Sequence, residues 1–304
     1  MPDSSNKNNT SQSDIKMSEI TSNPLRKRPR SSSIPDFSNS YPNSLFKDNH
    51  YNTDKMIASV FMDTPNNYVE AINCPNKSNW INAINDELNN LYNNKIMTFV
   101  KHILKNKNLI TTKWVFATKK DANNIIKYKA RLVARGFKQK YGIDYELTYS
   151  PALNIDGLKL IFALSAKFRW NVYQLDIKAA YLNAPLDRDI YTTIPKGDSN
   201  FGRGYWKLNK ALYGLKQSGR QWNKTITKFL IKQGFKQILS EKCIFKYSVK
   251  NKTKCIIGLY VDDMIIAGED KIITNIIKKI KNKFKVSNCG PVRIYIRNKS
   301  RKRK

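Results

Sequence analysis

Histidine and cysteine are scarce in this chain, and long apolar runs are missing. The only two histidines are His50 and His102, which disfavours a Ser-His-Asp mechanism and most histidine-based metal sites. The four cysteines form no Cys-x-x-Cys pair, so the sequence contains no zinc knuckle or thioredoxin-type site, and we expect reduced core thiols. No apolar run approaches the ~20 residues of a bilayer span, and no signal peptide is visible. We therefore expect an intracellular, cytoplasmic protein that is not embedded in a membrane.

Acidic residues are also few. The 304 residues include 55 Lys+Arg and 23 Asp+Glu, which gives a net charge of +32. Such a charge calls for a polyanionic partner, and nucleic acid is the commonest one because each neutralised phosphate releases counterions. The sequence is also rich in Lys and Asn, so compositional drift of an AT-rich coding sequence is an alternative explanation for part of the charge.

Composition divides the chain into three parts. Residues 1–55 are rich in Ser and Asn and too poor in apolar residues to fold, which predicts a disordered basic tail. Within this tail lies a cluster that is either a nuclear-import signal or a phosphate-binding patch; it consists of Arg26, Lys27, Arg28 and Arg30. Residues 56–292 carry the folded domain, and residues 293–304 form a basic C-terminal tail.

The folded part mixes helices and hairpins without a strict βαβ rhythm, which predicts an α+β fold with an antiparallel sheet. Helices are expected after a Ser78 cap and over residues 156–167, 221–232 and 270–284. A hairpin is expected from residues 112–118 and 125–133 around an Asp/Asn turn at 121–124, with one cationic face. Residues 172–177 predict a strand that ends near Asp176.

Two adjacent aspartates, Asp262 and Asp263, lie between two apolar strands. A hairpin turn tolerates Asp, so turn chemistry is one interpretation. However, like charges beside buried strands repel and are costly to desolvate unless a cation compensates them. Carboxylates and substrate phosphates are ligands that Mg²⁺ favours. With Asp176 from a neighbouring strand, they form a candidate two-metal site for nucleotidyl transfer.

Several segments together resemble the reverse transcriptase domain of copia-type long-terminal-repeat retrotransposon polyproteins. The resemblance covers about residues 65–292. The matching segments, in chain order, are Tyr68-Val69-Glu70-Ala71, Trp80, Tyr128 to Phe137, Gly142-Ile143-Asp144-Tyr145, Gln174 to Asn183, Leu212 to Gln217 and Tyr260-Val261-Asp262-Asp263. The family implies a right-hand polymerase with fingers and an antiparallel palm sheet, acting on an RNA or DNA template-primer and deoxynucleoside triphosphates.

The resemblance also implies roles for individual residues. Asp176, Asp262 and Asp263 are expected to be catalytic and to bind two Mg²⁺ (or Mn²⁺) ions, with Asp263 the less direct ligand. Tyr181 is expected to exclude a ribose 2′-hydroxyl by steric clash, or else to be a core aromatic. A lysine that serves as general acid is expected near Lys283 or Lys285, but neither is assigned.

Further residues are expected to bind the nucleotide. Lys119, Lys120, Lys129 and Arg131 resemble the cations that contact the incoming triphosphate, and Arg131 suits bidentate phosphate contact. Lys119 and Lys120 are not separated by the sequence, and a solvated cationic face is the alternative for all four residues.

The loop of residues 212–217 is expected to lie near template and nucleotide. Gly214 is expected to allow a close backbone approach to the nascent base pair, and Lys216 and Gln217 to contact template or triphosphate.

The sequence departs from the family near its end. Only 304 − 263 = 41 residues follow Asp263, so we expect a C-terminally truncated domain without a thumb. The main expectation is a polymerase, and the alternative is a non-catalytic nucleic-acid-binding or degenerate retrotransposon fragment, whose salt-sensitive binding would survive Asp262→Asn.

Overall fold

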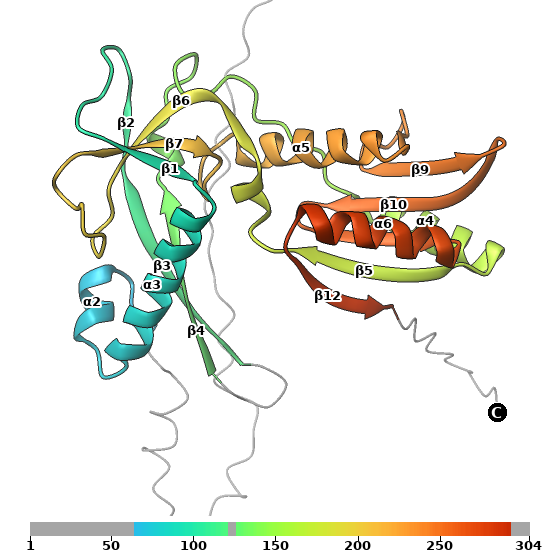
Figure 1. Ribbon diagram of the computed structural model, residues 1–304, viewed down its shortest axis with the longest axis horizontal. Helices are drawn as coiled ribbons and strands as arrows, with labels where there is room; N and C mark the ends of the chain where they lie inside the picture. The colour runs from blue at the N-terminus through green and yellow to red at the C-terminus, as the bar shows by residue number, and fades with distance from the viewer. Residues whose placement is uncertain (1–63, 121–125, 293–304) are drawn as a thin grey trace, which may run out of the picture. The chain divides into compact units, whose positions relative to one another are not determined.

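A six-stranded antiparallel sheet dominates the second half of the chain in the computed structural model, which describes residues 64–120 and 126–292 (Figure 1). Its strands, in spatial order, are β12 (Val286–Pro291), β5 (Asn171–Ile177), β11 (Asp263–Gly268), β10 (Lys252–Tyr260), β9 (Ile244–Val249) and β8 (Lys236–Gln237). The predicted strand ending near Asp176 and the two apolar strands around the aspartate pair are therefore confirmed as β5, β10 and β11.

Helices pack on both faces of this sheet. Helices α5 (Ser218–Lys232) and α6 (Asp270–Lys283) bury apolar stripes in one cluster with Leu175 and Ile177 of β5. Helix α4 (Ile155–Phe168) packs against the other face, in a cluster with Val172. Because alternate residues of a strand share a face, Asp176 lies on the same face of β5 as Val172 and Gln174.

A second sheet and a separate hairpin contain the other strands of the described chain. The sheet has the order β1 (Met97–Val100), β7 (Tyr205–Lys210), β6 (Pro185–Thr193) and β2 (Leu109–Ile110). Its β2–β6 pair is parallel, which the predicted antiparallel arrangement did not include. The short 3₁₀ segments η1 (Gly136–Lys138) and η2 (Ala180–Asn183) follow β4 and β5, respectively.

The predicted hairpin is present as β3 (Thr112–Lys120) and β4 (Ile126–Ala134), and its predicted turn at 121–124 lies outside the described residues. On β4, Ala130 and Leu132 are buried, whereas Lys129 and Arg131 are exposed. This alternation confirms the predicted cationic face.

Helix α3 (Lys77–Asn93) packs against β4 and follows the short helix α2 (Tyr68–Asn73). Trp80 of α3 meets the rings of Phe116 and Tyr128 edge to face, at centroid distances of 5.2 and 4.7 Å. The predicted cap was wrong, because the helix begins at Lys77 and Asn76 occupies the N-cap position. Ser78 therefore lies inside the first turn rather than before it.

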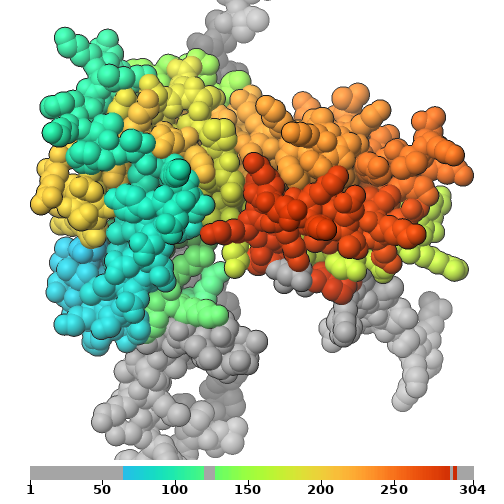
Figure 2. Space-filling model, in the orientation of Figure 1, coloured from blue at the N-terminus to red at the C-terminus, as the bar shows by residue number. Residues whose placement is uncertain are grey.

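The outer side of α6 is rich in lysine and faces the viewer in Figure 2.

Three of the four cysteines have described side chains and are free thiols: Cys243 and Cys255 are buried and Cys74 is partly buried. None of the helices in the described ranges is long and apolar enough to cross a membrane. The two predicted tails and the cluster at residues 26–30 lie outside the described residues, and the predicted domain limits stay predictions.

Candidate active site

The three aspartates singled out by the sequence lie at one end of the six-stranded sheet. Asp263 of β11 is the direct cross-strand partner of Asp176 of β5. The backbone N–H of Ile177 donates to the carbonyl oxygen of Asp262 at 2.9 Å. The β10–β11 turn and the end of β5 are therefore fixed against each other by backbone pairing.

The turn that carries Asp262 has an unusual backbone. Val261 has a φ of +54°, in the left-handed region that a β-branched residue rarely adopts. Its carbonyl oxygen accepts a 2.6 Å hydrogen bond from the indole Nε1 of Trp222, which is buried on α5. Helix α5, which packs on one face of the sheet, thus supports the strained turn.

Each carboxylate of the register pair has its own hydrogen-bond donor. Ser287 of β12 lies opposite Asp176 and donates from its hydroxyl to Asp176 Oδ2 at 2.7 Å. Asp263 Oδ1 instead accepts from Gln174 Nε2 at 3.3 Å. The two aspartates are partners on adjacent strands, but each carboxylate accepts from a different side chain.

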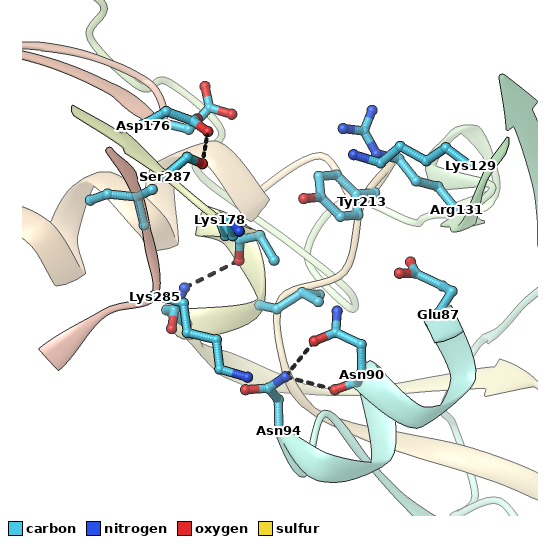
Figure 3. Close-up of a pocket in the computed structure, with 15 residues that line it drawn as sticks. Glu87, Asn90, Asn94, Lys129, Arg131, Asp176, Lys178, Tyr213, Lys285 and Ser287 are labelled. Carbon is cyan, nitrogen blue, oxygen red and sulfur yellow. Dashed lines mark hydrogen bonds between the residues drawn. The ribbon is translucent and has the colours of Figure 1, made fainter. Parts of the chain in front are cut away.

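A pocket of about 560 Å³ opens beside this end of the sheet (Figure 3). Its lining combines carboxylates, cations and amides from both halves of the described chain. The lining residues are Glu87, Asn90, Asn94, Lys129, Arg131, Asp176, Ile177, Lys178, Ala179, Leu182, Asn183, Tyr213, Asp262, Lys285 and Ser287. Lys129, Arg131 and Tyr213 lie across the pocket from Asp176 and Ser287. Asp263 does not line it.

The electrostatic environment of Asp262 disfavours its charge. Partial burial of the carboxyl group raises the pKa of Asp262, and the negative charges of Asp263 and Asp176 raise it further. A backbone hydrogen bond and the positive charge of Arg131 act in the opposite direction on this pKa. An added cation near Asp262 would relieve the repulsion between the carboxylates.

The donor set fits a magnesium site that the substrate completes. Within residues 64–120 and 126–292, no group of three or more His, Cys, Asp or Glu side chains is arranged to hold a metal ion. Mg²⁺ is commonly bound by one or two carboxylates, several waters and substrate phosphates, rather than by a cage of protein ligands. Asp176 and Asp262, which line one pocket, supply two such carboxylates.

The four cations that were predicted to bind the nucleotide differ in whether they line the pocket. Lys129 and Arg131 line the pocket. Lys119 is exposed and pairs with Lys127 across the hairpin, on the same face as Lys129. Lys120 pairs with Ile126 through the backbone, and its side chain is not among those described. The structure therefore brings Lys129 and Arg131 to the pocket that Asp176 and Asp262 also line.

The charge of Lys129 is sensitive to these neighbours. Partial burial of its charged group lowers the pKa of Lys129, and the positive charges of Arg131 and Lys119 lower it further. The carboxylates of Glu87 and Asp176 act in the opposite direction on this pKa. Lys129 is thus influenced by acidic groups on both sides of the pocket.

Two tyrosines stand together near Asp262. The rings of Tyr181 and Tyr213 meet edge to face at 5.4 Å, and the Arg131 guanidinium lies 5.2 Å from the Tyr213 ring centroid. Burial raises the pKa of Tyr213 to about 12. Burial and the charge of Asp262 raise the pKa of Tyr181. Tyr181 is half-buried and lies next to the pocket without lining it.

Gly214 is required by packing within the chain. Its φ is +88°, and a Cβ there would stand 2.1 Å from the carbonyl oxygen of Ala134. The neighbouring Tyr213 carbonyl accepts from the Ala134 N–H at 2.8 Å. The loop therefore lies directly against the end of β4, and the predicted contact of Gly214 with a base pair stays a prediction.

Lys216 and Gln217 contact the segment that follows β4. The Lys216 ammonium is 3.0 Å from the Tyr145 hydroxyl. Gln217 is 1% exposed; its amide accepts from Gln139 at 2.9 Å and donates to the Asp144 carbonyl at 2.8 Å. Gln217 thus braces the loop in this structure, and the nucleotide contacts predicted for both residues stay predictions.

Sequence reasoning missed several pocket residues, of which Glu87 is the most informative. Helix α3 buries a stripe formed by Trp80, Ala83, Ile84, Leu88 and Leu91. Glu87 lies within that stripe, four residues after Ala83 and four before Leu91. An acidic residue inside an apolar stripe is unusual, and this position was the sequence signal that could have identified Glu87. Of the two lysines left unassigned by the sequence, Lys285 lines the pocket and Lys283 does not.

The sequence of this chain is similar to sequences of known proteins. The sequence model of a family described as reverse transcriptase (RNA-dependent DNA polymerase) matches residues 94–299. The Retrovirus-related Pol polyprotein from transposon TNT 1-94 of Nicotiana tabacum is 35% identical over 75% of this chain, and that from transposon RE1 of Arabidopsis thaliana is 30% identical over 72%. The Transposon Ty1-H Gag-Pol polyprotein of Saccharomyces cerevisiae is 35% identical over 59%.

The relatives are much longer than this chain. The matched region spans 17% of the tobacco polyprotein, 15% of the Arabidopsis polyprotein and 10% of the yeast polyprotein. The family match covers 299 − 93 = 206 residues, more than half of the 304. The chain therefore belongs to the reverse transcriptase family, as a reverse transcriptase domain of the kind found in retrotransposon Pol polyproteins.

Proposed function

We propose that this domain adds deoxynucleotides to the 3′-hydroxyl of a primer, directed by an RNA or DNA template. The observation that carries the proposal is that Asp176 and Asp262 line one pocket with Lys129 and Arg131. Nucleotidyl transfer needs carboxylates for divalent cations and separate cations for the triphosphate. In this proposal the six-stranded sheet is the palm of a right-hand polymerase, and the β3–β4 hairpin belongs to its fingers.

Asp176 and Asp262 would hold two Mg²⁺ or Mn²⁺ ions, which lower the pKa of the primer hydroxyl and neutralise charge on the leaving pyrophosphate. Asp263, paired with Asp176 but outside the pocket lining, would contribute mainly to the local negative field. The backbone pairing at the end of the sheet would keep these groups in place as the substrate arrives.

The opposite side of the pocket would bind the triphosphate. Arg131 presents a planar guanidinium suited to two phosphate oxygens, and the Tyr213 ring beside it would limit its movement. Lys129 would add a second positive charge, with Lys119 further along the same face. The ring of Tyr181, in contact with Tyr213, would clash with a ribose 2′-hydroxyl and so exclude ribonucleotides.

Primer extension tests the proposal. The full chain is incubated with a primer-template, deoxynucleoside triphosphates and Mg²⁺, beside Asp262→Asn and the control Asp156→Asn, which alters an exposed carboxylate on α4. Incorporation by the wild type and the control, and its loss in Asp262→Asn, would support the proposal. An inactive wild type at high protein concentration in both Mg²⁺ and Mn²⁺ would refute it.

A non-catalytic nucleic-acid binder is the second candidate, and the net charge of +32 favours it. Such a protein would bind RNA in a salt-sensitive and sequence-indifferent manner, because phosphate contacts dominate the affinity. Its binding would be the same in Asp262→Asn as in the wild type. Incorporation and binding assays on the same two proteins therefore distinguish the two functions.

A further inference from the structure

The outer edge of β4 is held by two groups from elsewhere in the chain. In the described structure β3 and β4 form a two-stranded sheet, so one edge of β4 has no partner strand. The N–H of Ala134 donates to the Tyr213 carbonyl at 2.8 Å. Two residues earlier, the N–H of Leu132 donates to Glu87 Oε1 at 3.2 Å. These contacts satisfy alternate N–H groups that point away from β3.

Glu87 is therefore the side chain by which α3 contacts the backbone edge of β4. Leu132 is fully buried, and its neighbour Arg131 is exposed toward the pocket. Because successive strand residues point to opposite faces, the position of the Leu132 backbone determines where Arg131 and Lys129 project. In Figure 3, Glu87 lies on α3 on the same side of the pocket as Arg131 and Lys129.

We propose that Glu87 is a positioning residue for nucleotide binding: its hydrogen bond with the Leu132 N–H fixes the edge of β4, so that Lys129 and Arg131 face Asp176 and Asp262. This inference rests on the proposed function, because it assumes that these cations meet a triphosphate. Glu87 itself acts through β4 and need not touch the nucleotide.

The acceptor, rather than the negative charge, is the essential feature of Glu87. Burial raises the pKa of Glu87, so the site disfavours the ionised form, whereas the Leu132 N–H, Arg131 and Lys129 favour it. A glutamine has the same length and keeps an oxygen acceptor, so it should preserve the contact. An aspartate keeps the charge but withdraws the oxygen by about 1.5 Å, the length of one C–C bond.

Three variants test this distinction: Glu87→Gln, Glu87→Asp and Glu87→Ala. The control is Asp86→Asn, which removes a charge from the adjacent, exposed position of α3. For each full-length protein, KM for dTTP and kcat are measured in primer extension, the Kd for inorganic triphosphate is measured by calorimetry, and thermal unfolding is recorded.

We expect Glu87→Asp and Glu87→Ala to raise KM and the triphosphate Kd about 10-fold, the size of one lost hydrogen bond, with kcat much less affected. Glu87→Gln should stay within about 3-fold of the wild type, as should the control. If Glu87→Ala does not fold, the comparison of Glu87→Asp with Glu87→Gln decides.

Two results would overturn the inference. One is unchanged KM and Kd in Glu87→Asp, and the other is a Glu87→Gln protein as impaired as Glu87→Asp. A purely structural role would reduce the melting temperature and the active fraction while leaving KM and Kd unchanged, which also contradicts it. A wild type that binds triphosphate with the expected variant pattern but does not extend a primer would refute the proposed function and support the positioning role.

Discussion

The hydroxyl of Ser287 donates a 2.7 Å hydrogen bond to Oδ2 of Asp176, across the antiparallel pairing of β12 and β5. Groups of this kind orient carboxylates that bind metal ions. The contact joins the last described strand to the strand that carries the first of the three aspartates. Its loss should therefore affect metal binding before it affects the fold.

Ser287→Ala should raise the Mg²⁺ concentration for half-maximal incorporation about 10-fold, because the Asp176 carboxylate loses its oriented donor. Direct Mn²⁺ binding, measured by electron paramagnetic resonance, should weaken in parallel. Ser248→Ala, at an exposed position on β9, is the matched control. An unchanged metal requirement in Ser287→Ala would show that this hydrogen bond does not support metal binding.

Asp262→Asn should lower incorporation on the order of 1,000-fold and yet raise the melting temperature at pH 7. Burial, Asp263 and Asp176 raise the pKa of Asp262, so the folded chain holds this proton more tightly than the unfolded chain. The ionised carboxylate therefore destabilises the fold above its folded-state pKa.

The stability difference between wild type and Asp262→Asn should disappear as the pH falls below about 3.9, the ordinary pKa of an aspartate. Below that pH, Asp262 is protonated in both the folded and the unfolded chain. Thermal melts across this range measure it. A variant that is less stable than the wild type at pH 7 would contradict the predicted electrostatic strain.

Tyr181→Ala should raise incorporation of ribonucleotides relative to deoxynucleotides by about 10- to 100-fold, because the ring that excludes a 2′-hydroxyl is removed. Tyr181→Phe keeps the ring and its contact with Tyr213, so it should keep the wild-type preference. Competing single-nucleotide incorporations give the ratio directly. Equal ratios in Tyr181→Ala and the wild type would leave Tyr181 as a packing residue only.

Gly214→Ala should destabilise the domain by about 2–4 kcal/mol, because a Cβ there meets the Ala134 carbonyl oxygen and the backbone has a left-handed φ. Gly202 has a similar φ of +79° but open space around it, so Gly202→Ala should cost only about 1 kcal/mol. Denaturant melts give the loss in free energy of unfolding for each variant, and the difference between the two losses is the contribution of the clash. Equal costs at the two positions would show that the contact with β4 does not matter.

The sequence by itself determined several local elements, including those that carry the aspartates. The apolar runs around Asp262 and Asp263 predicted β10 and β11, and the alternation of basic and apolar residues predicted the cationic face of the β3–β4 hairpin. These features depend on spacing along the chain, which periodicity reports directly. The motif order was sufficient to identify the family.

Only the tertiary structure decided which of these groups share a pocket. Register placed Asp263 opposite Asp176, and packing of the β3–β4 hairpin brought Lys129 and Arg131 to the same pocket as Asp262. The tertiary structure also buried Gln217, where it stabilises its loop, and connected Glu87 to the edge of β4, 45 residues away. Such relations arise from contacts between distant segments, and no local pattern of residue types contains them.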